Sequence, residues 1–492
     1  MSSTLSQPAT TSRLIAGPFN RVEGDLEITL DIEEGRVSAA YANSPLFRGF
    51  EQILLGKDPR DALTITPRIC GICSISQSAA AARALADASG LVSTEAGQTA
   101  AALIHAVENL ADHLTHFYLF FMPDFAKPIY ADRPWHGQAL DRVAGSAGGQ
   151  GSSRALQARA ELLHIMGLLA GKWPHTLALQ PGGVTKTPNT SDLVRLHSIL
   201  RGFRRFLETE MIGGPLEAFA ALETHKALEH WHHNEPGGGD LRLFLTIAED
   251  LALHKAGMGP DRFLSFGAYP RSDGPLFAQG LWRTGSLHEV PFDAIEEHIG
   301  YSWMTGTGPL HPFAGETHPD PAMADPAYSW CKAPRLVGRS VEVGAIARQI
   351  VDGHPLALDL ARNGASVHSR VVGRVLEIAR TVLALEGWIS GLRPEDHYIR
   401  RGNPLKDGRG MGLVEAARGS LGHWLEAKGG KLTRYQIIAP TTWNFSPRDD
   451  FGQPGPVEQA LVGAEVRPGE EAPIAVQHIV RSFDPCMVCT VH

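Results

Sequence analysis

The chain has 492 residues, of which 43% are hydrophobic and 20% are charged, a balance that is ordinary for a folded protein with a sizeable core. Its formal charge of -8 gives no basic face for nucleic acid and no lysine- and arginine-rich block for an anionic membrane. Its apolar runs stay shorter than the roughly 20 residues that a membrane-spanning helix needs. We therefore expect no nucleic-acid partner and no direct membrane span.

The predicted elements begin after a polar segment, residues 1–12, which has no apolar stretch and indicates a disordered lead-in rather than a secretory signal. Alternating apolar positions over 25–32, followed by a turn and a second alternating run, predict a β-hairpin. Apolar residues recur at helical spacing over 94–122, 154–171, 190–212, 241–256 and 368–391. Stretches rich in Gly and Pro predict loops at 144–152, 235–239 and 305–326.

The fold class that follows is α+β, with a mostly helical core and small β-sheet regions. The loops are not convincing domain linkers, and the two ends of the chain carry matching motifs. We expect residues 13–492 to form a single intertwined domain.

Those motifs are two Cys-x-x-Cys pairs, Cys70/Cys73 and Cys486/Cys489, at opposite ends of the chain. A total of five cysteines is too few for a disulfide framework, and this spacing suits metal binding in a reducing compartment, so we expect a cytoplasmic protein. Thiolates select soft or borderline metals. On spacing alone, four cysteines fit a structural zinc site as well as any other metal centre.

The flanking sequences narrow this choice. In chain order, the two pairs are accompanied by Arg21-Val-Glu-Gly-Asp25, Arg48-Gly-Phe-Glu51, Lys332-Ala-Pro-Arg335 and Pro440-Thr-Thr-Trp-Asn444. Together these motifs resemble the large, catalytic subunit of nickel-iron hydrogenases over nearly the whole chain. The resemblance implies the fold of that family and the heterolytic activation of dihydrogen.

The resemblance also implies a cofactor. In that family four cysteines hold nickel, and two of them bridge to an iron that carries carbon monoxide and two cyanides. By motif position, Cys73 and Cys489 are the bridging ligands, whereas Cys70 and Cys486 bind nickel alone. Cys486 is then the candidate base that removes a proton from dihydrogen.

Several charged residues match catalytic positions of the family. Glu23 matches an acidic residue that relays protons, although an ordinary salt bridge is the alternative for it. Arg335 matches the guanidinium above the open metal position, and Asp112 and Asp484 match the carboxylates that orient it. A buried structural ion-pair cluster is the alternative for Arg335.

Further positions match groups around the metals. Pro440 and Thr441 match residues beside the iron-bound diatomics, where a hydroxyl can donate to cyanide. Glu51, His492 and a main-chain carbonyl near Ile437 match the ligands of magnesium or a similar hard ion.

Other residues bear on the subtype. Gln77 occupies a position where energy-converting relatives place histidine and hydrogen sensors place glutamine. Ile72 and Phe120 match gas-channel positions that are smaller in oxygen-sensitive relatives, although each is also ordinary core packing. Together with the end of the chain at His492, they favour a hydrogen sensor that feeds a histidine kinase. An energy-converting uptake hydrogenase and a noncatalytic metal-binding scaffold are the alternatives.

The resemblance finally implies partner proteins. Only Cys331 remains beyond the four candidate ligands, so iron-sulfur clusters are expected only in a small partner subunit. Maturation proteins would deliver the iron diatomics and then nickel. A second metal site among His225, His230, His232 and His233 is conceivable, but histidines in such a mixed helix and loop stretch are more typical of surface or capping groups.

Overall fold

The computed structural model describes residues 12–144, 148–234 and 238–492. Of the predicted lead-in 1–12, residues 1–11 lie outside the described residues, and Ser12 begins the strand β1 (Ser12–Ala16). Part of the predicted loop 235–239 also lies outside them, whereas 305–326 contains no helix or long strand, as predicted.

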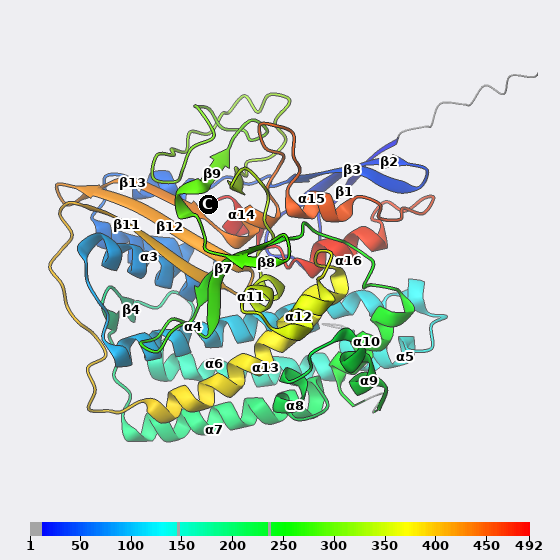
Figure 1. Ribbon diagram of the computed structural model, residues 1–492, viewed down its shortest axis with the longest axis horizontal. Coiled ribbons are helices and arrows are strands. Elements are labelled where there is room, and N and C mark those ends of the chain that lie inside the picture. The colour runs from blue at the N-terminus through cyan, green and yellow to red at the C-terminus, as the bar shows by residue number, and fades with distance from the viewer. Residues whose placement is uncertain (1–11, 145–147, 235–237) are drawn as a thin grey trace, which may run out of the picture.

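Four long helices lie together along one side of the molecule in Figure 1: α4 (Glu95–Thr115), α6 (Gln150–Ala170), α7 (Thr190–Phe206) and α13 (Val367–Gly391). All four were predicted from apolar spacing. Residues 145–147 of the predicted loop 144–152 lie outside the described residues, and the loop ends earlier than predicted because α6 begins at Gln150. π-helical turns at His116–Phe121 and Leu207–Met211 extend α4 and α7 to about the predicted ends.

The other helices are shorter. The predicted segment 241–256 overlaps α10 (Asp240–Asp250), which ends earlier than expected. The remaining α-helices are α1 (Phe50–Leu54), α2 (Ala62–Ile65), α3 (Ser74–Ser89), α5 (His136–Val143), α8 (Leu216–Ala220), α9 (His225–Asn234), α11 (Ala345–Val351), α12 (Pro355–Leu360), α14 (Pro440–Asn444), α15 (Pro456–Leu461), α16 (Ile474–Ser482) and α17 (Met487–Thr490).

Small antiparallel sheets complete the fold. The predicted hairpin is present as β2 (Glu27–Glu33) and β3 (Arg36–Asn43), and β1 adds a strand that the sequence analysis did not predict. The other sheets pair β4 (Leu179–Gln180) with β5 (Gly183–Val184), β6 (Arg262–Ala268) with β7 (Phe277–Arg283) and β8 (Ser286–His288), β9 (Ile295–His298) with β10 (Ala333–Leu336), and β11 (Gly408–Ala416) with β12 (Gly419–Lys428) and β13 (Lys431–Ile438). The predicted α+β class is confirmed.

The helix α3 packs unusually close to β11, because glycines face alanines across the contact. A Cβ atom on Gly412 would lie 1.9 Å from the carbonyl oxygen of Ala80, and one on Gly410 would lie 2.4 Å from that of Ala84. Only glycine permits this approach. Since Cys73 immediately precedes α3, the contact also fixes the start of the helix that follows one cysteine pair.

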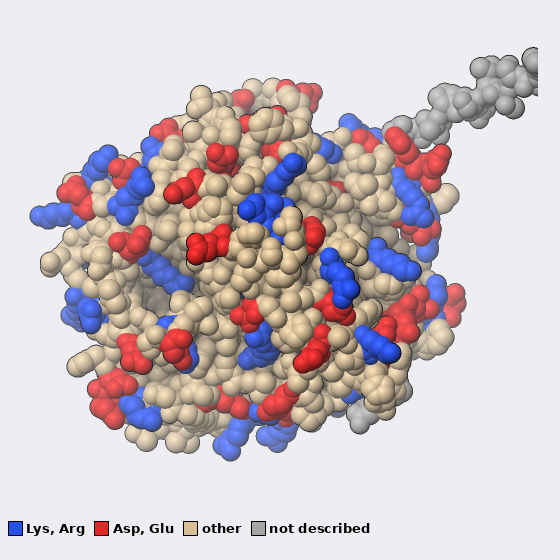
Figure 2. Space-filling model, viewed as in Figure 1, with Lys and Arg blue, Asp and Glu red and all other residues tan. Residues whose placement is uncertain are grey.

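The face drawn in Figure 2 carries Lys and Arg interspersed with Asp and Glu, so it presents no continuous basic surface. Within the described part of the chain, no helix combines the length and the apolar character that crossing a bilayer requires.

We predict that Gly412→Ala lowers the free energy of unfolding by about 3 kcal/mol or more, because its methyl group would overlap a helix carbonyl that cannot move alone. The control is Gly387→Ala within α13, where an added Cβ meets nothing within 4 Å. This control should be neutral or stabilising by up to about 1 kcal/mol. Urea unfolding midpoints test both, and equal midpoints for the two variants would contradict the proposed close packing.

Candidate metal centre

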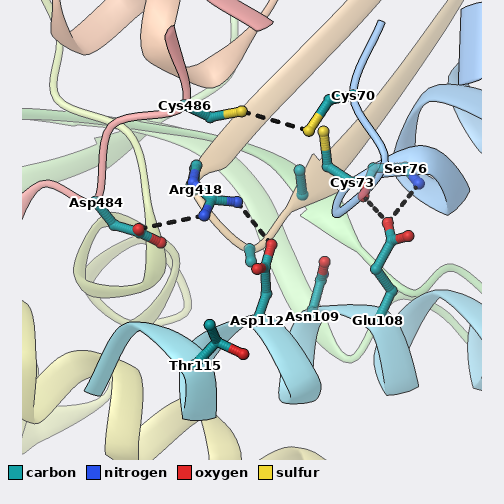
Figure 3. Close-up of polar contacts among 12 residues, drawn as sticks. Cys70, Cys73, Ser76, Glu108, Asn109, Asp112, Thr115, Arg418, Asp484 and Cys486 are labelled. Carbon is teal, nitrogen blue, oxygen red and sulfur yellow. Dashed lines mark hydrogen bonds and ion pairs between the residues drawn. The ribbon is translucent and has the colours of Figure 1, made fainter. Parts of the chain in front are cut away.

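The four cysteines of the two pairs meet in the interior. The Sγ atoms of Cys73 and Cys489 are 3.0 Å apart, those of Cys486 and Cys489 are 3.1 Å apart, and those of Cys70 and Cys486 are 3.5 Å apart. Their residues are at most 6% exposed. All four offer a sulfur atom to one point, as expected from the motifs. Figure 3 shows three of them, Cys70, Cys73 and Cys486, close to one another.

Arg48 ties the two pairs together. Its guanidinium donates to the carbonyl oxygen of Ile69, at 2.6 Å, and to that of Val488, so it contacts the residue before one cysteine of each pair. A separate link joins the N-terminal motif to the tail, because the Met487 N–H donates to the carbonyl oxygen of Glu23 at 2.7 Å. The first pair and the tail are therefore held by groups distant in sequence.

Gly24 makes that link possible. Its φ of 84° is in the left-handed region, and an added Cβ would lie 3.1 Å from the backbone nitrogen of Val488. A larger residue would push the tail away from the N-terminal motif.

A guanidinium lies beside the thiols, but it belongs to Arg418. Its nitrogens donate to Asp112 Oδ2 at 2.6 Å and to Asp484 Oδ1 at 3.2 Å (Figure 3). Burial opposes the charge of Arg418, but Asp112 and Asp484 outweigh it and hold its pKa well above the ordinary value, and Cys486 and Cys73 add to this effect. Asp112 and Asp484 thus hold an arginine near the centre. This arginine is Arg418, whereas the prediction named Arg335.

The structure does not bring Arg335 to Asp112 and Asp484. It lies on β10, and its side chain points to the loop 446–453, where it donates to Asp449 Oδ2 at 2.9 Å, to Ser446 Oγ at 3.1 Å and to the Gln453 carbonyl at 2.8 Å. Those acceptors satisfy a fully buried guanidinium. The alternative considered for Arg335, a buried structural ion-pair cluster, describes its surroundings.

Arg418 occupies the tip of the β11–β12 hairpin, since Ala416 pairs with Gly419. Another buried arginine, Arg348, donates to the carbonyl oxygens of Ala416 and Ala417 at 2.8 and 3.1 Å and so holds the backbone of this turn in place. The signal that could have identified Arg418 is the pair of alternating runs on either side of Ala417-Arg418-Gly419, which predicts a hairpin with an arginine at its tip.

The two aspartates differ in their electrostatics. Burial raises the pKa of Asp112 to about 7 even though Arg418 favours its ionised form. Burial also opposes ionisation of Asp484, but there Arg418 outweighs it and lowers the pKa. This pair therefore holds a proton more readily on Asp112 than on Asp484.

Glu23 and Thr441 lie against Cys486. Burial raises the pKa of Glu23, and the nearby Cys70 raises it further. The backbone N–H of Cys486 donates to Thr441 Oγ1 at 3.1 Å, which leaves the hydroxyl proton free to be donated elsewhere. Pro440 is the first residue of the same short helix, α14, and fixes its start.

A second polar cluster lies where the tail ends. His492 Nε2 is 3.3 Å from Glu51 Oε1, and the Ile437 N–H donates to the same oxygen at 2.8 Å. Burial opposes ionisation of Glu51, but Lys332 and His492 hold its pKa at about 2. The three predicted hard-ion residues are thus brought together, although the contact seen for Ile437 uses its N–H rather than its carbonyl.

Gln77 is buried on α3, and its Oε1 lies 2.8 Å from His423 Nε2 on β12. Ile72 is partly buried between the cysteines of the first pair. Phe120 lies in the π-helical turn after α4, where its carbonyl oxygen accepts from Arg21 at 3.0 Å.

Glu108 also belongs to this site, although no sequence motif predicted it. Its carboxylate accepts the backbone N–H groups of Ile75 and Ser76 at 2.8 and 2.9 Å and the indole N–H of Trp173 at 3.0 Å. It thereby fixes the first turn of α3, directly after Cys73 (Figure 3). The available signal was its spacing of one helical turn from Asp112, which places both carboxyls on one face of α4.

The thiols fit a thiolate-binding metal centre. Hydrogen bonds with Cys486 and Cys489 raise the pKa of Cys73, and burial raises that of Cys489. Several adjacent anions in a dry site repel one another, so these thiols ionise together only when a cation compensates them. Four soft sulfur donors suit nickel and iron.

Comparison with known proteins agrees with this centre. A family model described as nickel-dependent hydrogenase matches residues 48–135 and 153–492. The chain belongs to the nickel-dependent hydrogenases. It is a large subunit of a nickel-iron hydrogenase, an oxidoreductase that activates dihydrogen, and the predicted family is confirmed.

Relatives match this hydrogenase subunit along its length. It is 30% identical to the periplasmic [NiFeSe] hydrogenase large subunit of Desulfomicrobium baculatum, over 99% of this chain and 97% of that protein. It is 25% identical to the uptake hydrogenase large subunit of Rhodobacter capsulatus, over 98% and 95%. The crystal structure of a reduced, active Ni-Fe-Se hydrogenase from Desulfomicrobium baculatum superposes with a TM-score of 0.83 at 30% identity, covering 98% and 100% of the chains.

We predict that Arg418→Lys in this hydrogenase keeps nickel and iron but lowers the rate of dihydrogen oxidation about 100-fold, because lysine cannot hold both aspartates with a rigid fork. Arg335→Lys is the matched control. It should lower thermal stability while leaving the rate per nickel within about twofold. Dye reduction under dihydrogen and metal analysis measure both, and a loss of turnover confined to the Arg335 variant would reverse the assignment.

Proposed function

We propose that this subunit cleaves dihydrogen heterolytically at a nickel-iron centre held by Cys70, Cys73, Cys486 and Cys489. The observation that carries the proposal is the meeting of four buried thiols from both ends of the chain beside a guanidinium anchored by two carboxylates. When bound, the centre supplies Lewis-acid and electron-accepting chemistry. The reaction releases two protons and two electrons from each dihydrogen.

The residues around the thiols divide the remaining tasks. Cys486 Sγ accepts the first proton, and Glu23, whose pKa is raised by burial, passes it on. Arg418 holds positive charge above the thiols, and Asp112 and Asp484 fix its orientation. A guanidinium stays protonated at neutral pH, so its contribution is electrostatic and positional.

The proposed ligand assignment follows the motifs. Cys73 and Cys489 would be shared ligands of nickel and iron, and Cys70 and Cys486 would be ligands of nickel. Pro440 and Thr441 would line the place of the iron with its carbon monoxide and two cyanides, and the Thr441 hydroxyl proton is free to be donated there. A magnesium or similar hard ion is bound by Glu51, His492 and the carbonyl of Ile437, a group of buried residues already in contact.

Electrons must leave through another protein. Apart from the four ligands the chain has only Cys331, which is buried and whose pKa burial raises strongly, so an iron-sulfur small subunit is the proposed acceptor. Maturation proteins would insert the metals. We further propose a single intertwined domain over 13–492, supported by one hydrophobic core cluster that includes residues from both β1 and the tail.

We propose a hydrogen-sensing role in the cytoplasm, with a histidine kinase as the receiver of the signal. The first support is Gln77, which lies four residues after Cys73 and contacts the buried His423. The second is the pair of bulky residues at the proposed gas-channel positions, Ile72 and Phe120. An uptake hydrogenase is the alternative, favoured by the name of the Rhodobacter capsulatus relative. A noncatalytic scaffold is disfavoured because all four thiols are present and clustered.

Purification with the small subunit, followed by metal analysis and infrared spectroscopy, tests the centre. We expect one nickel per chain and bands from one carbon monoxide and two cyanides. The matched variant is Cys486→Ser, which should lose nickel or activity, with Cys331→Ser as a control that keeps both. Zinc alone in native, matured protein, without diatomic bands, would overturn the proposal.

For the sensing role, we predict that Gln77→His shifts the dihydrogen concentration that gives a half-maximal kinase response by about three- to tenfold, the equivalent of one altered buried hydrogen bond. The surface variant Gln157→His should leave it unchanged. Kinase autophosphorylation measured across dihydrogen concentrations tests this. An unchanged response in both variants, or rapid sustained turnover coupled to quinone reduction, would count against sensing.

A further inference from the structure

A second group of histidines lies between α9, α10 and α13, three helices that are labelled in Figure 1. A cavity of about 60 Å³ opens between these helices. Its polar lining consists of His225, Glu229, His232, Glu249, His254 and His368. This volume holds an ion and a few water molecules but not an organic cofactor.

Two side chains of the cavity lining, His232 and Glu249, converge on one point with the neighbouring His233. One nitrogen of His232, one of His233 and a carboxylate oxygen of Glu249 all lie within 4.8 Å of one another. His233 Nε2 is 3.1 Å from Glu249 Oε2. Two ligands of a tetrahedral zinc ion lie roughly 3.4 Å apart, so a small rotation of the two exposed side chains would complete a site.

His232 is the fixed member of the three, because it is only 4% exposed. The Thr246 hydroxyl donates to the Arg242 carbonyl at 3.2 Å, so it accepts the Nε2–H of His232, also at 3.2 Å. This arrangement leaves a lone pair on Nδ1, and Nδ1 has no hydrogen-bond partner among the described residues. An imidazole that donates from one nitrogen and presents the other as a lone pair is the usual state of a metal ligand.

Electrostatics favour a cation at the same point. Glu249 and Asp250 are the last two residues of α10, where the helix dipole is negative. Asp250 is neutralised by Arg133, at 3.2 Å, whereas Glu249 is paired with the titratable His233. A divalent ion would compensate both the carboxylate and the helix end.

We propose that His232 Nδ1, His233 and Glu249 bind a borderline divalent cation of the Zn²⁺ and Ni²⁺ class, separate from the nickel-iron centre. Two imidazoles and one carboxylate suit such ions, and water fills the remaining positions from the cavity side. The ion joins the last turn of α9 to the last turn of α10. It is a structural clip and takes no part in dihydrogen cleavage.

Zinc binding to the complete heterodimer tests this proposal. The protein is purified without a histidine tag, dialysed against a chelator and equilibrated with increasing Zn²⁺, and bound zinc is measured per chain. Wild-type protein should bind one zinc ion, and X-ray absorption at the zinc edge should show scattering from two imidazoles. His232→Ala and Glu249→Gln should each weaken binding by at least about tenfold.

The control is His230→Ala, which removes an exposed histidine of the same helix outside the group and should leave zinc binding unchanged. Glu249→Gln changes a surface residue, so it remains informative if the buried His232 variant fails to fold. Unchanged dihydrogen oxidation in Glu249→Gln confirms an intact protein. Equal zinc affinity in wild type and Glu249→Gln, or a zinc site without imidazole scattering, would overturn the proposal.

Discussion

Four sulfur atoms from the two ends of the chain have to meet within a few ångströms, and much of the fold serves this requirement. Cys73 and Cys489 are 416 positions apart in sequence, yet their Sγ atoms are 3.0 Å apart. Arg48 holds the backbone beside both pairs, and Gly24 lets the N-terminal motif touch the tail. Such long-range closure makes the centre a product of the whole fold, because its loop entropy is offset by packing throughout the molecule.

Around the thiols, the energetic problem is buried charge. A guanidinium in a low-dielectric interior is costly unless its partners are well placed, and Arg418 has a carboxylate on each of two sides. Burial also raises the pKa of Asp112, so the cluster is not simply a set of fixed charges. The arrangement therefore combines Asp484, whose ionised form Arg418 favours, with a more readily protonated group on Asp112.

Local patterns predicted much of the fold. The long helices α4, α6, α7 and α13 have strong apolar periodicity, and the β2–β3 hairpin has clear alternation. The strand β1 was missed because it is short and mostly exposed, so little apolar pattern marks it. The ends of helices were less accurate, since π-helical turns and local packing decide them.

The site was predictable only in part, for a related reason. The cysteines, Glu51 and His492 lie in distinctive motifs, and the structure brings them together. Arg335 and Arg418 are both fully or almost fully buried and near acidic residues, so residue type cannot distinguish them. The two arginines differ in position: Arg418 lies at the β11–β12 turn beside the thiols, whereas Arg335 lies on β10. Tertiary structure alone decides this difference. The role of Glu108 at the start of α3 likewise depends on contacts between distant segments.

The helix α4 connects these parts with a fixed spacing. Glu108 holds the first turn of α3, and Asp112, one helical turn later, holds Arg418. A one-residue insertion between them would rotate one carboxyl by about 100° relative to the other, so both anchors could not be kept at once. The length of this helical segment is therefore a constraint on which natural variants of the subunit can remain functional, whereas the surface loops are free to lengthen or shorten.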